Sequence, residues 1–596
     1  MINAYSDIKK NGLSFVMITS ALGGVLYVLG FPSFVGVQLF LAPSLGVSLL
    51  LLNLDLRLSC PSTTFYRQLL PIIIFSIFFG IIGLYWIPRS AETVGFSPPF
   101  NYLLLMFYSL ISAPQYISFF LLLTLGRYLS ARISGHTSRY QNIFLHLRSL
   151  SSRNLLLALL LTLCEYWTPT AVPTYIGHGY MQLAPYLGLA NYGGEIIFSF
   201  FAFWLSFIIV GYLKEKRIDL MGTIFFLLFL AINFILPLKY APTTADPVNH
   251  IRLVQANVDS LLKDSAKKGV RQAYEQVFAT YYQLSYPLSA KLNGTPPAPV
   301  DPPIDLIIWP ETAYPFSLSL GSMIKDPTTI PKWPLYISSL IKTDIFFGGY
   351  VNNDKKNSKN KPTGSTGSTE LTELTESDEL SQYEQTYNSV FFLQYPEKIQ
   401  GVYNKHLLIP FGETLPFGGI SYRVFNKLLP EMGFFARGDS FPTFSTKNNT
   451  QFVSVICYEI IFSEFVRKVL NQAQAASNLP AHFLVNVSND SWSNTLTEQE
   501  QHLFLARWRA IEHNLPIIRS TNTGISTIIY PDGSLGPTIP INTTGQLTIK
   551  IATPYRIPTF FQRWGVAVTV IFALVALATS VILVTLVINP TRRSIN

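Results

Sequence analysis

The sequence predicts a multi-pass α-helical membrane bundle joined to an α/β domain outside the membrane. Its 596 residues exceed the usual size of one compact domain. Hydrophobic residues make up 49% of the chain and charged residues only 13%, against about 25% charged residues in soluble domains. The mean hydropathy of +0.31 agrees. Apolar stretches flank a long polar block on both sides, which indicates two kinds of structure in one chain.

Eight apolar stretches are candidates for helices that cross about 30 Å of hydrocarbon. They lie near residues 13–31, 36–53, 69–87, 101–126, 154–167, 194–213, 219–238 and 564–588. The stretch at 154–167 is the shortest of them. We therefore assign residues 1–240 to a transmembrane bundle of about seven helices and residues 562–590 to a C-terminal transmembrane helix.

Positive charge in the short loops predicts the orientation of the bundle. Lysine and arginine precede the first stretch, occupy alternate loops and follow the last stretch: Lys9, Lys10, Arg57, Arg67, Arg127, Arg132, Arg139, Arg148, Arg153, Lys214, Lys216, Arg217, Arg592 and Arg593. The opposite short loops carry only Arg89, offset by Glu92. Because positive loops stay cytoplasmic, both termini are predicted to be cytoplasmic. The same bias explains much of the net charge of +9 without a nucleic-acid partner.

The block from 245 to 556 is predicted to be an extracytoplasmic α/β domain. Short β-rich runs predict strands at 251–255, 304–309, 345–351, 389–393, 452–456, 483–487 and 525–530. Apolar residues at helical spacing predict a helix over 496–514. Residues 353–386 repeat short Gly-Ser-Thr and Glu-Leu-Thr pieces that cannot bury a core. We expect them to form a disordered surface insertion.

Cys457, directly after the predicted strand 452–456, is the first candidate for chemistry. From composition alone, a buried and inert cysteine is the simpler interpretation. However, Cys457 is predicted to lie on the oxidising side of the membrane without a disulfide partner. Cys60 falls in a predicted cytoplasmic loop and Cys164 in an apolar stretch. A nucleophile at a strand end explains an unpaired thiol there.

Glu311 and Lys405 are the second and third candidates. Glu311 ends the run from Leu306 to Pro310, and a carboxylate beside apolar residues has a raised pKa that suits proton transfer. Lys405 lies in an apolar and aromatic run, so its ammonium needs an anionic partner or a transient oxyanion. Taken singly, an exposed glutamate and a lysine with its charge in solvent are the alternatives.

Together these motifs resemble a known family. Trp309-Pro310-Glu311, Tyr403-Asn404-Lys405 with Pro410-Phe411-Gly412-Glu413, and Cys457-Tyr458-Glu459 resemble the Glu, Lys and Cys signatures of the nitrilase superfamily. With the flanking membrane stretches they resemble its membrane-embedded branch, the apolipoprotein N-acyltransferases. Asp264 and Ser493-Asn494 depart from that pattern, where the family usually has an aromatic residue and Phe-Gly.

The resemblance implies a nitrilase-like α-β-β-α sandwich in a bacterial inner membrane protein. Glu311 would take the proton of Cys457, whose thiolate would attack the sn-1 ester of a phospholipid. Lys405 and a backbone N–H near Tyr458 would stabilise the oxyanion. The resulting thioester would pass the acyl chain to the amine of a diacylglyceryl-cysteine at an apolipoprotein N-terminus. No metal or cofactor is implied.

Further residues are expected to support this site. Glu413 and Glu459 would orient Lys405 and polarise the pocket, a structural ion pair being the alternative. Tyr458 would contribute packing or an N–H donor. The expected substrate-binding residues are Phe411, Leu415, Pro416, Phe417 and Trp492. The first four belong to an apolar loop near Lys405 that either lines a lipid entrance or packs in the core.

Two other functions remain open at this point. A membrane-anchored nitrilase-type amidase would use the same three residues to hydrolyse a small amide, with water as the acceptor. A membrane transport or binding protein would need no chemistry, but it would be expected to carry internal repeats or ionisable residues within its spans. No repeat is evident, and Glu165 and Glu195 lie near the ends of predicted spans. The eight predicted spans favour an enzyme that uses lipid.

Overall fold

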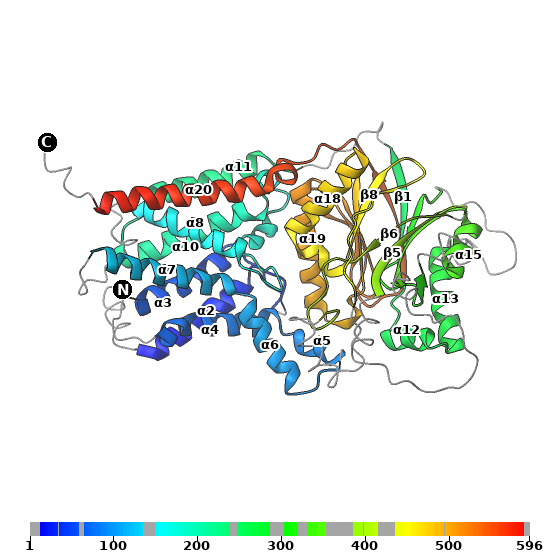
Figure 1. Ribbon diagram of the computed structural model, residues 1–596, viewed down its shortest axis with the longest axis horizontal. Coiled ribbons are helices and arrows are strands. Elements are labelled where there is room, and N and C mark those ends of the chain that lie inside the picture. Colours follow the sequence, from blue (N-terminus) through cyan, green and yellow to red (C-terminus); the bar gives the residue numbers. More distant parts are fainter. Residues whose placement is uncertain are drawn as a thin grey trace, which may run out of the picture.

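A computed structural model shows a helical part and a sheet-containing part lying end to end (Figure 1). The structure describes residues 12–33, 35–58, 65–93, 95–134, 150–238, 247–286, 303–319, 331–352, 386–396, 398–414, 435–493 and 495–588. Several predictions fall outside the described residues: those on Cys60, on residues 353–385 of the expected insertion, on Leu415, Pro416 and Phe417, and on Asn494.

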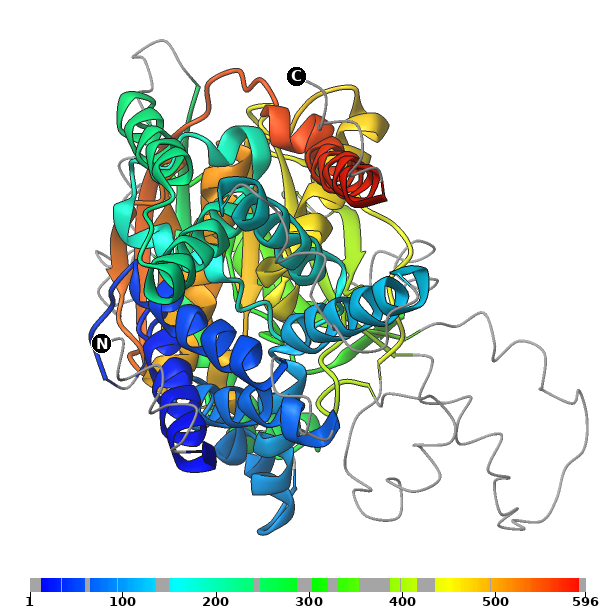
Figure 2. The ribbon, with the colours of Figure 1, turned by 90° about the vertical axis from the view of Figure 1, so that its left-hand side faces the viewer.

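Elongated helices of the first part run alongside one another, and the C-terminal helix returns to them (Figures 1 and 2). The helices of this part, including the short α5 and α9, are α2 (Gly12–Val28), α3 (Ala42–Leu58), α4 (Phe65–Gly83), α5 (Ile87–Thr93), α6 (Phe100–Ile111), α7 (Pro114–Ser134), α8 (Leu150–Trp167), α9 (Ala190–Gly193), α10 (Glu195–Glu215), α11 (Leu220–Ile235) and α20 (Phe560–Ile588), with the 3-10 helix η2 (Ile176–Leu183). A helix occurs at each of the eight predicted apolar stretches.

Three of the described helices are long and apolar enough to cross a membrane singly, at 65–83, 195–215 and 560–578. The predicted stretch 101–126 is broken, because α6 and α7 meet at an angle of 47° and qualify only as one bent span. Pro114 starts α7, and proline disfavours a helical conformation in the residue before it. The helices α2 and α11 are apolar but shorter. The number of spans therefore stays a prediction.

The second part contains two β-sheets. The first has the strand order β13-β1-β2-β4-β5-β6, with β3 also paired to β4. Its strands are β1 (Val248–Gln255), β2 (Leu306–Ile308), β3 (Ser317–Ser319), β4 (Asp344–Asn352), β5 (Thr386–Gln394), β6 (Lys398–Asn404) and β13 (Gly545–Ala552). The second has the order β12-β11-β10-β9-β8-β7, formed by β7 (Phe444–Ser445), β8 (Gln451–Ile456), β9 (Phe483–Ser488), β10 (Ile517–Thr521), β11 (Ser526–Ile529) and β12 (Leu535–Ile539).

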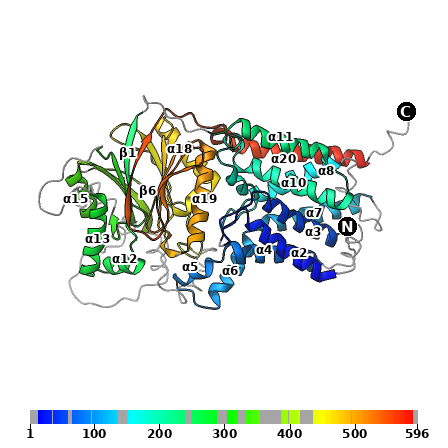
Figure 3. The same cartoon turned by 180° about the vertical axis from the view of Figure 1, so that it is seen from behind.

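Helices cover the outer face of each sheet. The helices α12 (Ser260–Lys267), α13 (Arg271–Ser285) and α15 (Lys332–Ile341) cover the first, while α18 (Ser463–Ser477) and α19 (Leu496–His513) lie between the second sheet and the bundle (Figures 1 and 3). Apolar side chains of both sheets, such as Phe346 and Phe452, meet in a shared core. The expected α-β-β-α sandwich is confirmed.

One central strand, β10, was not among the predicted strands. Its apolar part is only Ile517-Ile518, and polar residues follow directly. Arg519 is nevertheless fully buried, because it forms an ion pair of 3.0 Å with Asp490. A charged residue interrupts the apolar run by which a buried strand is predicted from sequence, so this strand was not predicted.

Candidate active site

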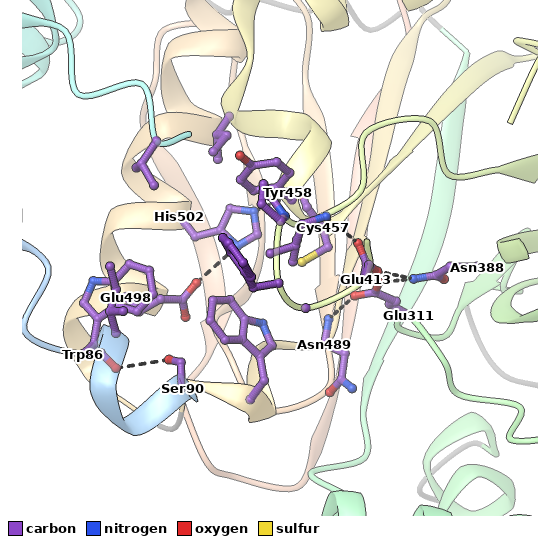
Figure 4. Close-up of a pocket in the computed structure, with 18 of the residues that line it drawn as sticks. Trp86, Ser90, Glu311, Asn388, Glu413, Cys457, Tyr458, Asn489, Glu498 and His502 are labelled. Carbon is purple, nitrogen blue, oxygen red and sulfur yellow. Dashed lines mark hydrogen bonds and ion pairs between the residues drawn. The ribbon is translucent and has the colours of Figure 1, made fainter. Parts of the chain in front are cut away.

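Glu311, Lys405 and Cys457 come from three strand ends and line one cavity of about 280 Å³. Glu311 follows β2, Lys405 follows β6 and Cys457 follows β8. The first two belong to one sheet and Cys457 to the other, so the sandwich itself brings them together. Each is at most 4% exposed. Figure 4 shows the sulfur of Cys457 beside the carboxylates.

Cys457 occupies a sharp turn from strand into helix. Its backbone φ is +49°, which is unusual for a residue other than glycine. It is also the first residue of the 3-10 helix η5 (Cys457–Ile461). The N–H groups in a first helical turn have no acceptor within the helix, so the N–H of Tyr458 is available to a bound oxygen. The turn therefore places a thiol next to a backbone donor.

A buried hydrogen-bond network holds the carboxylate and the ammonium. Lys405 Nζ lies 2.8 Å from Glu413 Oε1 and 3.3 Å from Glu311 Oε1. Asn388 Nδ2 donates to both carboxylates, at 2.7 Å and 3.0 Å. The backbone N–H of Asn489 donates to Glu311 Oε2 at 2.7 Å. An ammonium has three donors, so these two contacts leave one for a ligand.

Burial and neighbouring charges set the protonation of the site. Burial raises the pKa of Cys457, the charge of Glu311 raises it further, and Lys405 lowers it. Burial also raises the pKa of Glu311, against the effect of Lys405. For Lys405, burial lowers the pKa, but Glu311 and Glu413 together raise it well above its usual range. The resting site therefore holds a charged lysine and a thiol that must lose its proton before it can attack.

Sequence comparison places this geometry in a family. Residues 251–556, just over half of the chain, match the carbon-nitrogen hydrolase family. The chain belongs to this family. The resemblance of its motifs to the nitrilase superfamily is thereby confirmed.

Curated relatives of this carbon-nitrogen hydrolase family member carry the name apolipoprotein N-acyltransferase. The protein of Rhodopseudomonas palustris is 28% identical over 55% of this chain and 52% of its own length. That of Bdellovibrio bacteriovorus is 29% identical over 52% and 50%. That of Haemophilus influenzae is 28% identical over 67% and 70%. The chain thus spans about half the length of the first two relatives.

Among solved structures, an amidase from Nesterenkonia sp. aligns with 53% of this chain and 94% of its own. The sequence identity is 13% and the TM-score is 0.31, which is too low to support a conclusion.

Glu459 connects the turn after β8 with the loop after β6. Its carboxylate accepts hydrogen bonds from Ile456 N at 2.8 Å, Tyr403 Oη at 2.7 Å, His406 N at 2.6 Å and Leu407 N at 3.1 Å. Burial raises the pKa of Glu459 to about 7. It therefore fixes the backbone around the site, whereas Glu413 contacts the ammonium of Lys405 directly.

The other expected site residues that the structure describes fall into two groups. Phe411, Tyr458 and Trp492 line the cavity. The ring of Phe411 lies 6.1 Å from that of Phe107, and the ring of Trp492 lies 5.7 Å from that of Trp86. Asp264, by contrast, is exposed on α12 and is not among the lining residues. Its departure from the family pattern leaves the described cavity wall unchanged.

The sequence analysis did not predict that the helical bundle forms part of the cavity wall. Trp86, directly before α5, and Ser90 of α5 form one wall of the cavity together with Leu104 and Tyr108 of α6. Hydrogen bonds hold that wall against α19, including Trp86 Nε1 to Gln501 Oε1 at 3.1 Å. The local sequence of an apolar helix does not show whether the helix lies against a strand end that is far away along the chain.

His502, behind the nucleophile, was also given no role. Its Nε2 lies 3.1 Å from the carbonyl oxygen of Cys457, and its Nδ1 lies 3.2 Å from Arg519 Nη2. A neutral imidazole with its proton on Nε2 satisfies both contacts, and burial lowers its pKa accordingly. Asp490 lies close by, with possible metal-ligating atoms of Cys457, Asp490 and His502 within 4.8 Å of one another. Protein partners already engage Asp490 and both nitrogens of His502.

Gly348 of β4 offers a test of how Glu311 is placed. A Cβ at this position would lie 2.6 Å from Glu311 Cα, closer than real Cβ contacts allow. We expect Gly348→Ala to displace Glu311 and to slow acylation of Cys457 by a chromogenic acyl ester about 100-fold. Gly349→Ala is the matched control, because the nearest atom there is a Phe391 side-chain carbon at 3.3 Å. Equal rates for the two variants would contradict this role.

Proposed function

We propose that the protein transfers an acyl chain from a phospholipid, through a thioester on Cys457, to the N-terminal amine of the diacylglyceryl-cysteine of apolipoproteins. The observation that carries this proposal is the composition of the cavity. The thiol, carboxylate and ammonium share it with a wall formed by the helical bundle. An acyl donor held in a membrane needs such an entrance, whereas a soluble amide does not. The names of the curated relatives agree with this function.

The first half-reaction uses the three central side chains. Glu311 takes the proton of Cys457, and the thiolate attacks the carbonyl carbon of the phospholipid ester. The third N–H of Lys405 and the N–H of Tyr458 hold the negative oxygen of the tetrahedral intermediate. When the intermediate collapses, Glu311 returns the proton to the departing lysophospholipid, and the acyl chain stays on sulfur as a thioester.

In the second half-reaction, the acceptor amine attacks this thioester. A carbon–nitrogen bond forms and the carbon–sulfur bond breaks. Glu311 takes the proton that the nitrogen loses and passes it to the departing thiolate, which regenerates the thiol of Cys457. The thioester preserves the activation of the original ester, so the cycle requires no external energy source.

We propose a multi-pass location in the bacterial inner membrane, with both termini cytoplasmic and the sandwich on the outer side. The charge distribution of the short loops supports this orientation. The position of the cavity agrees, because α5 and α6 lie at the end of the bundle that meets the sandwich (Figure 3). The site would then lie at the boundary between lipid and water.

The test supplies the full-length protein in phospholipid nanodiscs with a diacylated lipopeptide. Intact-mass spectrometry should show an acyl adduct on the protein before the peptide is added. Addition of the peptide should remove the adduct and yield a triacylated product. Release of free fatty acid without peptide acylation would contradict the proposal and would favour the hydrolase alternative.

A further inference from the structure

Glu498 is a third acidic side chain in the cavity, beside Glu311 and Glu413, and the chemistry described above does not use it. It lies on α19, is only 6% exposed and lines the same cavity as Cys457. Figure 4 shows Glu498 and Glu311 on opposite sides of the sulfur of Cys457. The two carboxylates therefore face a bound thioester from different directions.

We propose that Glu498 binds the α-ammonium group of the acyl acceptor and takes one of its protons, so that a neutral amine meets the Cys457 thioester. This inference rests on the function proposed above and assigns the second substrate to a named side chain.

The hydrogen bonds of Glu498 leave one oxygen available. Ser493 Oγ donates to Oε2 at 2.7 Å. Among the described residues, His502 Nδ1 supplies the only basic side-chain nitrogen within 4.0 Å of the carboxylate, at 3.9 Å from Oε1. That distance is too long for a hydrogen bond. The carboxylate thus has one short neutral partner and no bound cation.

The surrounding charges do not supply a counter-ion either. Arg519 is the nearby guanidinium, but it forms its ion pair with Asp490 at 3.0 Å. Burial and Arg519 lower the pKa of His502 against the effect of Asp490, and this disfavours a charged imidazole. On the bundle side, Trp86 and Ser90 line the cavity without bringing a charge. A buried carboxylate without a cation is unfavourable, so a cationic group that enters the cavity is drawn to this position.

The acidity of Glu498 suits an amine. Burial raises its pKa to about 8 and the charge of Asp490 contributes, while Ser493 and Arg519 act in the opposite direction. A free α-amino group has a pKa of about 8. At pH 7 both free groups are mostly protonated, so binding of the ammonium releases one proton. The remaining proton is then shared almost evenly between the amine nitrogen and the Glu498 carboxylate, and it can pass readily between them.

The position of Glu498 also suits attack on Cys457. His502 lies between them, with Nε2 at 3.1 Å from the carbonyl oxygen of Cys457 and Nδ1 at 3.9 Å from Glu498 Oε1. Only the width of one imidazole ring separates the amine-binding carboxylate from the turn that carries the thioester.

The proton balance closes. The ammonium gives one proton to the Glu498 carboxylate, and the nitrogen lone pair forms the carbon–nitrogen bond. The carbon–sulfur electrons leave with the Cys457 thiolate. Glu311, unprotonated since the lysophospholipid departed, takes the second proton from nitrogen and returns it to the thiolate. Glu498 releases its proton to water before the next acceptor binds.

The test separates the two half-reactions in nanodiscs at pH 7 and pH 9. We expect Glu498→Gln to form the Cys457 thioester within about twofold of the wild-type rate. Its kcat/KM for transfer to the diacylated lipopeptide should fall about tenfold at pH 7, because a charge-assisted hydrogen bond is lost. The defect should shrink at pH 9, where the free amine is already mostly neutral.

Two further variants sharpen the test. Glu500→Gln is the matched control, because Glu500 lies two residues away on α19, is partly exposed and does not line the cavity. It should behave as wild type. Glu498→Asp keeps the carboxylate and should recover part of the transfer rate at pH 7. Such a recovery would show that the loss in Glu498→Gln comes from the missing carboxylate and not from misfolding.

Three results would overturn the inference: an unchanged transfer rate in Glu498→Gln, an equal loss in both half-reactions, or an equal defect at both pH values. Failure of the wild type itself to form the thioester or to acylate the peptide would overturn the proposed function and this inference together. That failure is recognisable because it appears before any variant is compared.

Discussion

Cys457→Ser is expected to fold normally and to form no acyl adduct when incubated with phospholipid. The serine side chain has the same shape as that of cysteine and is only slightly smaller, so the packing around this buried position changes little. A serine hydroxyl, however, is a much weaker nucleophile than a thiolate when only one carboxylate serves as base. When catalytic residues act together, removal of the nucleophile typically abolishes nearly all of their joint rate enhancement. Turnover should therefore fall at least about 10⁴-fold.

The measurement combines intact-mass spectrometry with a thermal melt of the purified protein. Cys164→Ser is the matched control, because Cys164 is the other cysteine in the described part of the chain and is also buried. It lies in α8, away from the cavity, and should retain both the adduct and turnover. An adduct of unchanged yield in Cys457→Ser would show that another residue carries the acyl chain.

Lys405→Met should reduce the rate of thioester formation at least about 10³-fold. Removal of a single oxyanion donor typically costs 10²- to 10³-fold. Here the same change also removes the charge that lies between Glu311 and Glu413. Both carboxylates would then remain hydrogen-bonded to Asn388 Nδ2, at 2.7 Å and 3.0 Å, without a counter-ion.

The pH dependence of Lys405→Met provides a second readout. Lys405 lowers the pKa of Glu311 in the native site, so its removal raises that pKa further. The unprotonated base then appears only at higher pH, and the rising limb of the residual acylation rate should move upward. Lys263→Met is the control, because Lys263 is also buried near Glu311 but does not line the cavity. A similar loss in both variants would contradict a specific role of Lys405.

Local sequence patterns were sufficient for the main features of the site. Glu311 and Cys457 both follow short β-rich runs, and Lys405 interrupts an apolar one. A charged or nucleophilic residue at the end of a buried strand stands out against its neighbours. Each of the three residues alone had an ordinary structural interpretation, and only the three motifs together indicated a site. Glu413 and Glu459 were found through the same motifs, although Glu459 acts on the backbone and not on the ammonium.

The roles of Glu498 and His502 could not be predicted in the same way. They lie four residues apart on a helix whose predicted pattern was that of an ordinary amphipathic surface. Their burial arises because α19 is enclosed by the second sheet on one side and by the bundle on the other (Figure 1). A one-dimensional pattern cannot distinguish a polar residue that faces solvent from one that faces a cavity.

The sequence by itself determined the two kinds of structure and the family, and it predicted the three central residues of the site, because these depend on hydrophobic spacing and on short contiguous motifs. Only the tertiary structure decided that α5 and α6 close the cavity, that Arg519 is paired with Asp490, and that Glu498 lines the same cavity as the thiol. The physical reason is distance along the chain. Trp86 and Gln501 are 415 residues apart, and only folding brings such groups within a hydrogen bond of each other.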